Sequence, residues 1–366
     1  MTPSFLKNVV GHQTVKDRFA VALNRDRLPS TFLFVGPEGI GKKTFAIALA
    51  KALLCESNDS SSLEACGQCE GCTLMDAGNH PDFELVQKRK DKAYLLIEQF
   101  IGVKDRRNQE GMCHNISLTP FRGGRKIAVI DDADFFNQES ANCLLKTLEE
   151  PPPRSVLIMI GTSEQKQLST IRSRSQIVHF HPLSTDEVKQ VLNTLDTSEI
   201  EASSDEMAQQ SSGSLQVLQQ YREEGLLDFK SQFLSKLASC ETMTQGFPKE
   251  LIGFVDQAGK DAAKRRQRLR LLADFAIQFY RYIALHLAGS THKIPHSYLR
   301  PVQDAIKNWK SDAEAATECV ERCMDVHLQI AANANQATLI EAWLSDLGKL
   351  SRGDEAYENI KVTLAY

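Results

Sequence analysis

A glycine-rich stretch carries the first chemistry that the residue types suggest. Residues 36–42 read GPEGIGK and have a G-x-x-G-x-G-K spacing, formed by Gly36, Gly39, Gly41 and Lys42. In such a pattern the glycines let backbone N–H groups approach an anion, and the lysine reaches the β- and γ-phosphates of a nucleotide. An apolar stretch precedes the loop and a helical stretch follows it, so negative charge is also favoured by the helix N-terminus. We therefore predict a phosphate loop with these four residues as nucleotide-binding residues.

The residue after the loop lysine departs from this pattern. A Ser or Thr hydroxyl usually helps to hold Mg²⁺ there, but this chain has Lys43, and Thr44 comes one residue late. One residue turns a helix by about 100°, so Thr44 is not expected to replace the missing ligand. Lys43 could still attract phosphate. Two interpretations stay open, namely nucleotide binding and a retained loop without turnover. Efficient hydrolysis by this chain alone is less favoured than either.

An acidic strand end supplies the second nucleotide motif. Residues 126–136 read KIAVIDDADFF, and we expect Asp131 to orient Mg²⁺ through water. Asp132 stands where a Glu normally activates the attacking water, but Asp is about one methylene shorter and would be a poorly placed base. Thr162, after the next strand, could sense the γ-phosphate. Without the phosphate loop, a buried strand followed by a polar turn would explain the same residues.

Two arginines precede the last predicted strand. The stretch TIRSRSQ contains Arg172 and Arg174. Arginine at this position could reach across a subunit boundary to a neighbour's phosphates, as arginine fingers do. A surface arginine pair is the alternative interpretation.

Cysteines form the one dense cluster of metal-ligand residues. A C-x10-C-x2-C-x2-C spacing on an insertion after the phosphate-loop helix is formed by Cys55, Cys66, Cys69 and Cys72. Four thiolates at such spacing fit a closed tetrahedral zinc site that stabilises a small insertion without its own core. Cys55 could instead be a core residue at the helix end, with Cys113 and His114 as weaker alternative ligands. An iron–sulfur centre is the alternative to zinc.

The elements that must position these residues follow from the apolar runs. Five short runs, rich in β-branched or aromatic residues, predict strands at 31–36, 83–86, 126–131, 155–161 and 176–180. Continuous apolar runs suit strands that are buried on both faces, so we predict an α/β domain whose parallel sheet carries helices on both faces. These helices include residues 43–54 and residues 139–150, the second ended by three prolines.

The chain changes character after this domain. We place an α/β domain at 1–183, with the cysteine insertion at about 55–75. Two helical stretches predict a small lid at 184–224, and an all-α domain follows at 225–350. The fold of residues 351–366 is not readable. The basic run at 264–270 is expected on a solvated or subunit-facing helix rather than on a DNA contact.

Composition excludes some classes of protein. The 366 residues are 42% hydrophobic and 25% charged, which is enough for two or three domains with real cores. A net charge of -4 lacks the basic signature of a dedicated nucleic-acid binder. No apolar run approaches the roughly 20 residues of a membrane span, and the first residues lack a secretory signal. We therefore expect a cytoplasmic protein without a membrane partner.

Together these motifs resemble the clamp-loader ATPase family of bacterial replication, which is of the AAA+ P-loop type. The similarity is carried by RLPSTFLFVGPEGIGKKT, CGQCEGC, GNHPDF, FRGGRKIAVIDDADFFNQESANCLLKTLEEPPP and TIRSRSQ, and it is dense over about residues 5–183. The resemblance implies an AAA+ domain with an inserted zinc ribbon, a helical lid and a helical collar for oligomerisation. Within the family, the chain is most similar to delta-prime subunits, which act as a rigid stator.

The resemblance also implies partners and roles. The collar would assemble with delta and gamma/tau subunits into a pentameric ring, which loads the sliding clamp onto primed DNA for DNA polymerase III. The family's Ser-Arg-Cys motif matches Ser173, Arg174 and Ser175, so Arg174 is the candidate finger acting in trans. Lys43, Asp132 and, in the lid, Gln216 depart from the motor pattern.

These departures favour a stator over a gamma/tau-type motor, which remains the alternative. We expect the chain to belong to the polymerase holoenzyme, to have no polymerase site of its own and to hydrolyse ATP weakly or not at all. A structural Zn²⁺ is expected, whereas ATP and Mg²⁺ stay open as ligands.

Overall fold

The computed structural model describes residues 9–57, 64–89, 91–122, 124–194, 208, 211, 213–221, 225–240, 242, 246–291 and 294–354. The chain divides into two compact units, Met1–Gln219 and Gln220–Tyr366. The predicted lid has its α8 (Thr185–Thr194) and the start of α10 (Leu215–Tyr221) in the first unit, and part of it lies outside the described residues. Its separation as a domain, like the other predicted domain bounds, stays a prediction. Residues 355–366 of the predicted tail also lie outside the described residues.

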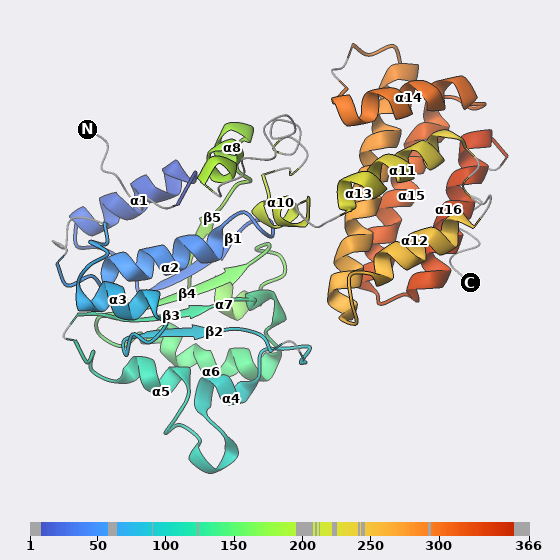
Figure 1. The fold of residues 1–366 in the computed structure, drawn as a ribbon. Helices are drawn as coiled ribbons and strands as arrows, with labels where there is room; N and C mark the ends of the chain where they lie inside the picture. Colours follow the sequence, from blue (N-terminus) through green and yellow to red (C-terminus); the bar gives the residue numbers. More distant parts are fainter. Residues whose placement is uncertain are drawn as a thin grey trace. The chain divides into compact units, whose positions relative to one another are not determined.

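The first unit is built on a five-stranded parallel sheet (Figure 1). The strand order is β2-β3-β4-β1-β5, with bounds close to the five predicted runs: β1 Thr31–Val35, β2 Phe83–Val86, β3 Lys126–Ile130, β4 Ser155–Gly161 and β5 Gln176–His179. The three central strands are buried at every residue, which explains why the sequence shows continuous apolar runs rather than alternation. The predicted α/β fold is confirmed.

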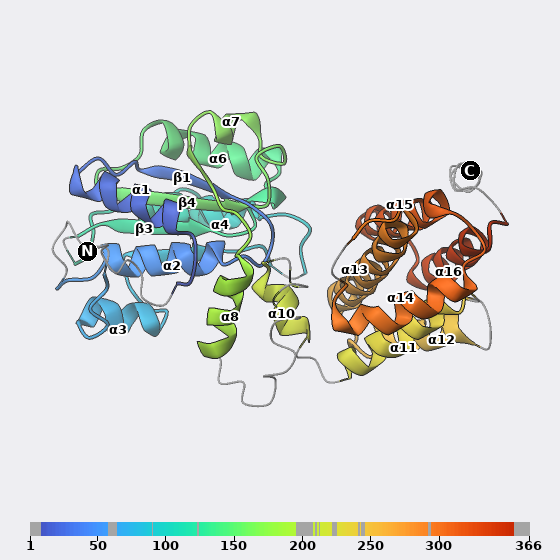
Figure 2. The same ribbon diagram turned by 90° about the horizontal axis from the view of Figure 1, so that it is seen from above.

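Helices cover both faces of this sheet (Figure 2). On one face, α1 (Gln13–Asn24) and α2 (Lys42–Leu53) pack against Phe32, Phe34 and their neighbours. On the other face lie four helices: α4 Ile97–Ile101, α5 Met112–Ser117, α6 Gln138–Glu149 and α7 Ser169–Arg172. Phe45 on α2 makes edge contacts with Phe34 and with Phe180, so the loop end of α2 is fixed to the sheet by aromatic packing.

The cysteine insertion and several short elements complete the first unit. The insertion follows α2 and contains α3 (Glu70–Asp76), and 3-10 turns lie at Lys104–Arg106 and Ala133–Phe135. The predicted helices at 43–54 and 139–150 correspond to α2 and α6. Asn137 caps α6 by accepting from the backbone N–H of Ser140 at 2.8 Å, and Pro151 follows its last turn.

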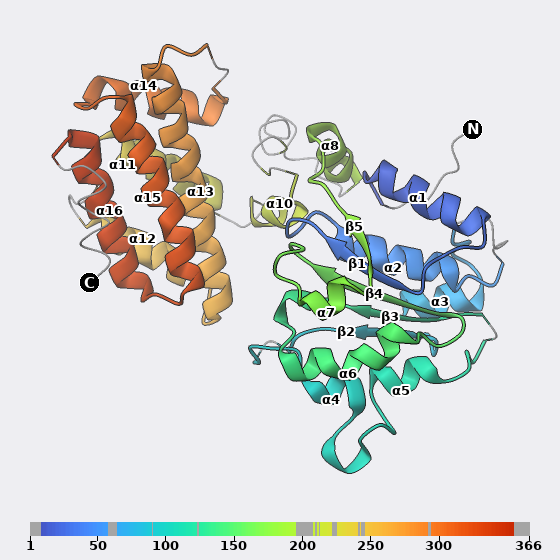
Figure 3. The ribbon, with the colours of Figure 1, turned by 180° about the vertical axis from the view of Figure 1, so that it is seen from behind.

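Every secondary-structure element among the described residues of the second unit is a helix (Figure 3). Its helices are α11 Leu226–Ala238, α12 Phe247–Asp256, α13 Ala262–Leu287, α14 His296–Asn308, α15 Ala313–Ala331 and α16 Gln336–Arg352. The long helices α13, α15 and α16 lie side by side, as predicted for an all-α domain. No helix in the described part of the chain is both long and apolar enough to span a bilayer.

One buried ion pair joins two helices of this bundle. Arg322 on α15 is fully buried and donates from Nε to Asp346 on α16 at 2.7 Å. Its Nη1 donates to Gln329 at 3.2 Å. Removing one partner of such a pair leaves a charge in the interior, which costs far more than the pair itself contributes.

Asp346→Asn should therefore lower the free energy of unfolding of the second unit by about 3 kcal/mol. The chain's two tryptophans, Trp309 and Trp343, both lie in this unit, so their fluorescence reports its unfolding in urea. The exposed pair of Arg352 and Asp354 supplies the matched control, and Asp354→Asn should change stability by less than about 0.5 kcal/mol. Equal effects of the two substitutions would contradict the assignment.

Candidate functional site

The phosphate loop joins the carboxyl end of β1 to the N-terminus of α2. Gly41 caps α2 in a left-handed conformation, with φ 97°, which favours glycine. A side chain at Gly36 would place its Cβ 2.3 Å from the carbonyl oxygen of Phe180, so only glycine fits beside the end of β5. His12, which precedes α1, lies with its Nε2 2.8 Å from the carbonyl oxygen of Ile40. The predicted strand–loop–helix arrangement is present.

Lys42 spans the loop. Its ammonium donates to the carbonyl oxygen of Gly36 at 2.6 Å and to that of Pro37 at 2.5 Å. The residue is buried, and burial lowers the pKa of its amine, opposed by the nearby carboxylates of Glu38, Asp134 and Asp131. An ammonium has three N–H donors, so one remains for a phosphate oxygen. Two of the three donors of this ammonium are thus used within the loop itself.

Lys43 points to the acidic strand end. Its Nζ lies 3.3 Å from Oδ2 of Asp131, the first residue after β3. Asp131 Oδ2 also accepts from Gln87 Nε2 at 3.1 Å, and its Oδ1 accepts from the backbone N–H of Asp132 at 3.1 Å. Thr44, one residue on, is exposed. The structure therefore sets an ammonium on the carboxylate that was expected to orient Mg²⁺.

The remaining acidic and polar residues lie beside this pair. Burial and the neighbouring Asp131 raise the pKa of Asp132. Asp134, which was not singled out in the sequence, accepts from the backbone N–H of Thr162 at 2.9 Å. The carbonyl oxygen of Thr162 accepts from the N–H of Gly36 at 3.2 Å, and its buried hydroxyl has no hydrogen-bond partner within the described residues. The ends of β3 and β4 are thereby tied to the loop.

The predicted lid also contacts the loop. The backbone N–H of Leu215 donates to the carbonyl oxygen of Gly39 at 2.8 Å, and the hydroxyl of Ser214 donates to that of Glu38 at 3.1 Å. A Cβ at Gly39 would lie 2.6 Å from the Cβ of Gln216. Gln216, a neutral residue where the family resemblance predicts an arginine, therefore lies against the phosphate loop. The sequence spacing of about 175 residues gave no sign of this contact.

Arg174 is held by an acid of α6. Its Nε donates to Glu149 at 2.9 Å, its Nη2 lies 2.7 Å from the same oxygen, and its Nη1 donates to the carbonyl oxygen of Thr170 at 3.1 Å. About a third of the Arg174 side chain is exposed. Arg172 has a longer ion pair, 3.9 Å from Glu164. Glu149 lies in the motif NQESANCLLKTLEEPPP, but the sequence alone did not indicate that it pairs with Arg174.

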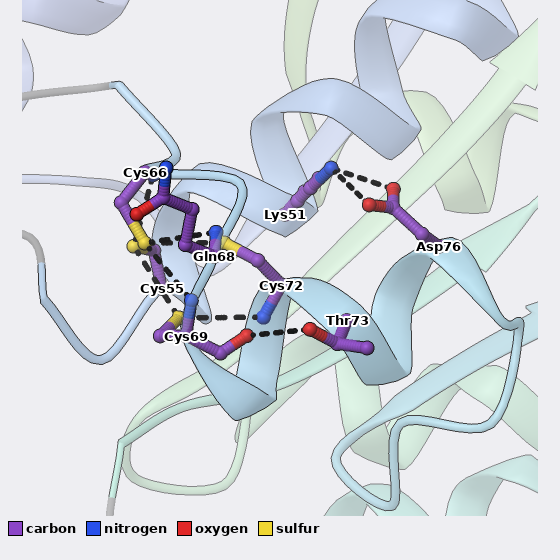
Figure 4. Close-up of polar contacts among 8 residues, drawn as sticks. All are labelled: Lys51, Cys55, Cys66, Gln68, Cys69, Cys72, Thr73 and Asp76. Carbon is purple, nitrogen blue, oxygen red and sulfur yellow. Dashed lines mark hydrogen bonds and ion pairs between the residues drawn. The ribbon is translucent and has the colours of Figure 1, made fainter.

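The four predicted cysteines meet in one cluster (Figure 4). Their sulfur atoms all lie within 4.8 Å of one another, with 3.8 Å between Cys55 and Cys69 and 3.9 Å between Cys66 and Cys72. A tetrahedral zinc ion with Zn–S bonds of about 2.3 Å separates its sulfurs by about 3.8 Å. The cluster could therefore bind a metal such as zinc, and Cys55 belongs to it rather than to the helix-end core alone.

Backbone geometry prepares this cluster for a metal. Cys66 Sγ accepts from the N–H groups of Gln68 and Cys69, which lower the pKa of the Cys66 thiol to about 6. Burial raises the pKa of Cys72 to about 12. A cation is therefore needed to hold all four as thiolates. The alternative ligands Cys113 and His114 lie on α5, and neither is in the cluster.

The insertion is fastened to the domain around it. Lys51 on α2 pairs with Asp76 on α3 at 2.5 Å (Figure 4). Arg122 pairs with Glu70 at 2.6 Å and also contacts Glu56. A metal in the cluster would therefore act structurally, since four thiolates leave no open position for a substrate.

Comparison with known proteins bears on residues 11–184, which match the family model described as DNA polymerase III, delta subunit. DNA polymerase III subunit delta' of Pseudomonas aeruginosa is 35% identical over 143 residues, 39% of this chain and 40% of that protein. The delta' subunit of Bacillus subtilis is 34% identical over 167 residues, 44% of this chain and 45% of that protein. The gamma/tau subunit of Mycoplasma genitalium is 30% identical over 193 residues, 53% of this chain and 30% of that protein.

The matched region thus spans less than half the length of these relatives. Residues 11–184, which match the family model, contain the phosphate loop, the acidic strand end, the cysteine cluster and Arg174. The family resemblance predicted from the sequence is confirmed for this part of the chain.

The purified chain should contain about one zinc ion, and Cys69→Ser should remove it, because three thiolates no longer close the tetrahedron. Metal analysis of the purified protein measures this directly. Cys143→Ser is the matched control, since Cys143 lies outside the cluster on α6 and should leave the zinc content unchanged. Iron in the wild type, or retention of zinc by Cys69→Ser, would contradict the assignment.

Proposed function

We propose that this chain, whose residues 11–184 belong to the delta-prime family of DNA polymerase III clamp-loader subunits, is a stator of the clamp loader. It would assist the ATP-dependent loading of the sliding clamp onto primed DNA by its complex. Its own phosphate loop would keep the fold of a nucleotide site without turning nucleotide over. The chain would have no polymerase site and would act in the cytoplasm.

The ion pair between Lys43 and Asp131 carries this proposal. A motor subunit needs Mg²⁺ beside the β- and γ-phosphates, held by a loop hydroxyl and by the acidic strand end. Here the hydroxyl is replaced by an ammonium, which offers no acceptor and neutralises the carboxylate. Asp132, a shorter base than Glu, and Gln216, a neutral residue against Gly39, support the same reading.

Arg174 would serve the neighbouring subunit. An arginine finger in trans stabilises charge on the phosphates that are transferred in another chain's site. The partly exposed guanidinium of Arg174, held in place by Glu149 and by the Thr170 carbonyl, supports such a role. The ion pair would keep the side chain extended in a defined direction until the neighbour's phosphates compete for it.

The helical unit would form the collar. We propose delta and gamma/tau subunits as its partners in a pentameric ring. On α15, Met324 and Leu328 are 56% and 68% exposed although they are apolar and one helical turn apart, which supports a subunit contact on this helix. In the basic run, Arg265 pairs with Asp256 and Arg268 stacks on Phe254, so these two arginines serve the bundle.

A gamma/tau-type motor is the second candidate, because a gamma/tau subunit matches this chain at similar identity. In that case Lys42, Asp131 and Asp132 would hydrolyse ATP within this chain. The two candidates differ in what the isolated chain does with ATP.

The isolated chain should hydrolyse ATP at the background rate, because its Mg²⁺ position is taken by Lys43. Phosphate release from the purified chain, with Lys42→Ala as the reference for background, measures this. Turnover that Lys42→Ala abolishes would favour the motor and would contradict the stator.

Arg174→Ala should lower the ATP turnover of the reconstituted clamp loader by about twofold or more while the complex still assembles, because one neighbouring site loses its finger. Arg172→Ala is the matched control and should leave turnover close to that of the wild type. Turnover, with assembly checked by size-exclusion chromatography, distinguishes the two positions. An unchanged rate for Arg174→Ala, or an equal loss for both variants, would rule out Arg174 as the finger.

A further inference from the structure

Two lysine ammonium groups face different partners at the phosphate loop. Lys42 crosses the loop and donates to two of the loop's own carbonyl oxygens, Gly36 and Pro37. Lys43, at the next position of α2, lies 3.3 Å from Asp131. The first turn of α2 contains both lysines and no acidic residue. The N-terminus of this 12-residue helix therefore presents two fixed positive charges in addition to its dipole.

Magnesium does not fit this arrangement. Mg²⁺ requires oxygen ligands in near-octahedral geometry, and in phosphate-loop proteins a loop hydroxyl and an acidic side chain contribute to them. Lys43 supplies no oxygen, and its ammonium lies on the carboxylate that remains. Both oxygens of Asp131 have further donors, Gln87 on one and the N–H of Asp132 on the other. A divalent cation there would have to displace three donors and approach an ammonium.

The features that bind phosphate are nevertheless intact. Gly39 and Gly41 hold the loop in left-handed conformations, with φ 75° and 97°. Lys42 retains one N–H beyond the two that it donates within the loop. The hydroxyl of Thr162, at the end of β4 beside Gly36, is buried and unpaired within the described residues. A linear polyphosphate would give these donors acceptors, and a polyanion beside Lys42 would offset the burial of its charge.

We infer that the phosphate loop binds the polyphosphate chain of a nucleoside triphosphate, or an inorganic polyphosphate, in its metal-free form, with the Lys43 ammonium as a built-in replacement for the divalent cation. This goes beyond the proposed function, which assigns the loop no ligand. The ammonium screens Asp131 from the phosphates and offers its own donors to them. Because this ammonium is part of the chain, phosphate binding does not require a metal ion. The site then also lacks a metal-activated water.

Calorimetric titration of the full chain with ATP, in EDTA and in excess Mg²⁺, tests this inference. The wild type should bind in EDTA with a dissociation constant within about threefold of the value in Mg²⁺. Lys43→Thr should bind at least about tenfold more tightly in Mg²⁺ than in EDTA, because the hydroxyl restores a metal ligand and the tethered charge is gone. Lys43→Met, with neither charge nor oxygen, should lose about tenfold in both buffers.

Lys51→Met is the matched control, because Lys51 lies on the same helix but pairs with Asp76 of the cysteine insertion. It should leave both dissociation constants unchanged, and melting curves verify that every variant is folded. Inorganic tripolyphosphate separates the two ligand sources. Equal behaviour of tripolyphosphate identifies the polyphosphate chain as the recognised group, and binding of ATP alone identifies a nucleotide. Either result supports a metal-free site.

Three outcomes would overturn the inference. They are wild-type binding that requires Mg²⁺, a metal response of Lys43→Thr equal to that of the wild type, and no wild-type binding at millimolar ATP in either buffer. The titration measures binding by the isolated chain, so these outcomes are distinct from failure of the stator proposal. The stator proposal would fail if the isolated chain turned ATP over, or if Arg174→Ala left the turnover of the reconstituted clamp loader unchanged.

Discussion

The parallel register of the central strands is the constraint on which the site depends. β1 is hydrogen-bonded to β4 and to β5, and β3 is hydrogen-bonded to β4 in the same direction. Because parallel strands end at one edge of the sheet, the phosphate loop after β1, Asp131 after β3 and Thr162 after β4 all meet there. The two apolar cores that flank these strands hold the register, since a one-residue slip would move Phe34 and Leu33 out of their own cores to the opposite faces.

At that edge, the contact between Lys43 and Asp131 decides what chemistry the fold can support. The loop glycines and Lys42 keep the shape of a nucleotide site, whereas the charge on Asp131 is already balanced within the chain. In our account the domain therefore works as a positioned scaffold, with Arg174 presented from the turn after α7. Ion pairs of Lys51 and Arg122 fasten the cysteine insertion to the same unit.

Much of this could be predicted from the sequence, because it depends on local patterns. The strands appear as apolar runs, and the four cysteines, Cys55 included, as a metal-ligand spacing, and the geometry then favoured the cluster over a helix-end core position for Cys55. Lys43 was visible as a missing hydroxyl, but its contact with Asp131 joins residues 88 positions apart and follows from strand register. The contacts of Gln216 with Gly39, and of Arg174 with Glu149, likewise depend on tertiary packing that no local pattern encodes.

We propose that the ammonium of Lys43 occupies the position that a divalent metal would take. A crystal structure of the chain grown with ATP and Mn²⁺, with anomalous diffraction recorded for manganese, tests it most directly. We expect no anomalous peak at Asp131 and the Lys43 ammonium on that carboxylate. A manganese ion bonded to Asp131, with Lys43 turned away from it, would contradict the account.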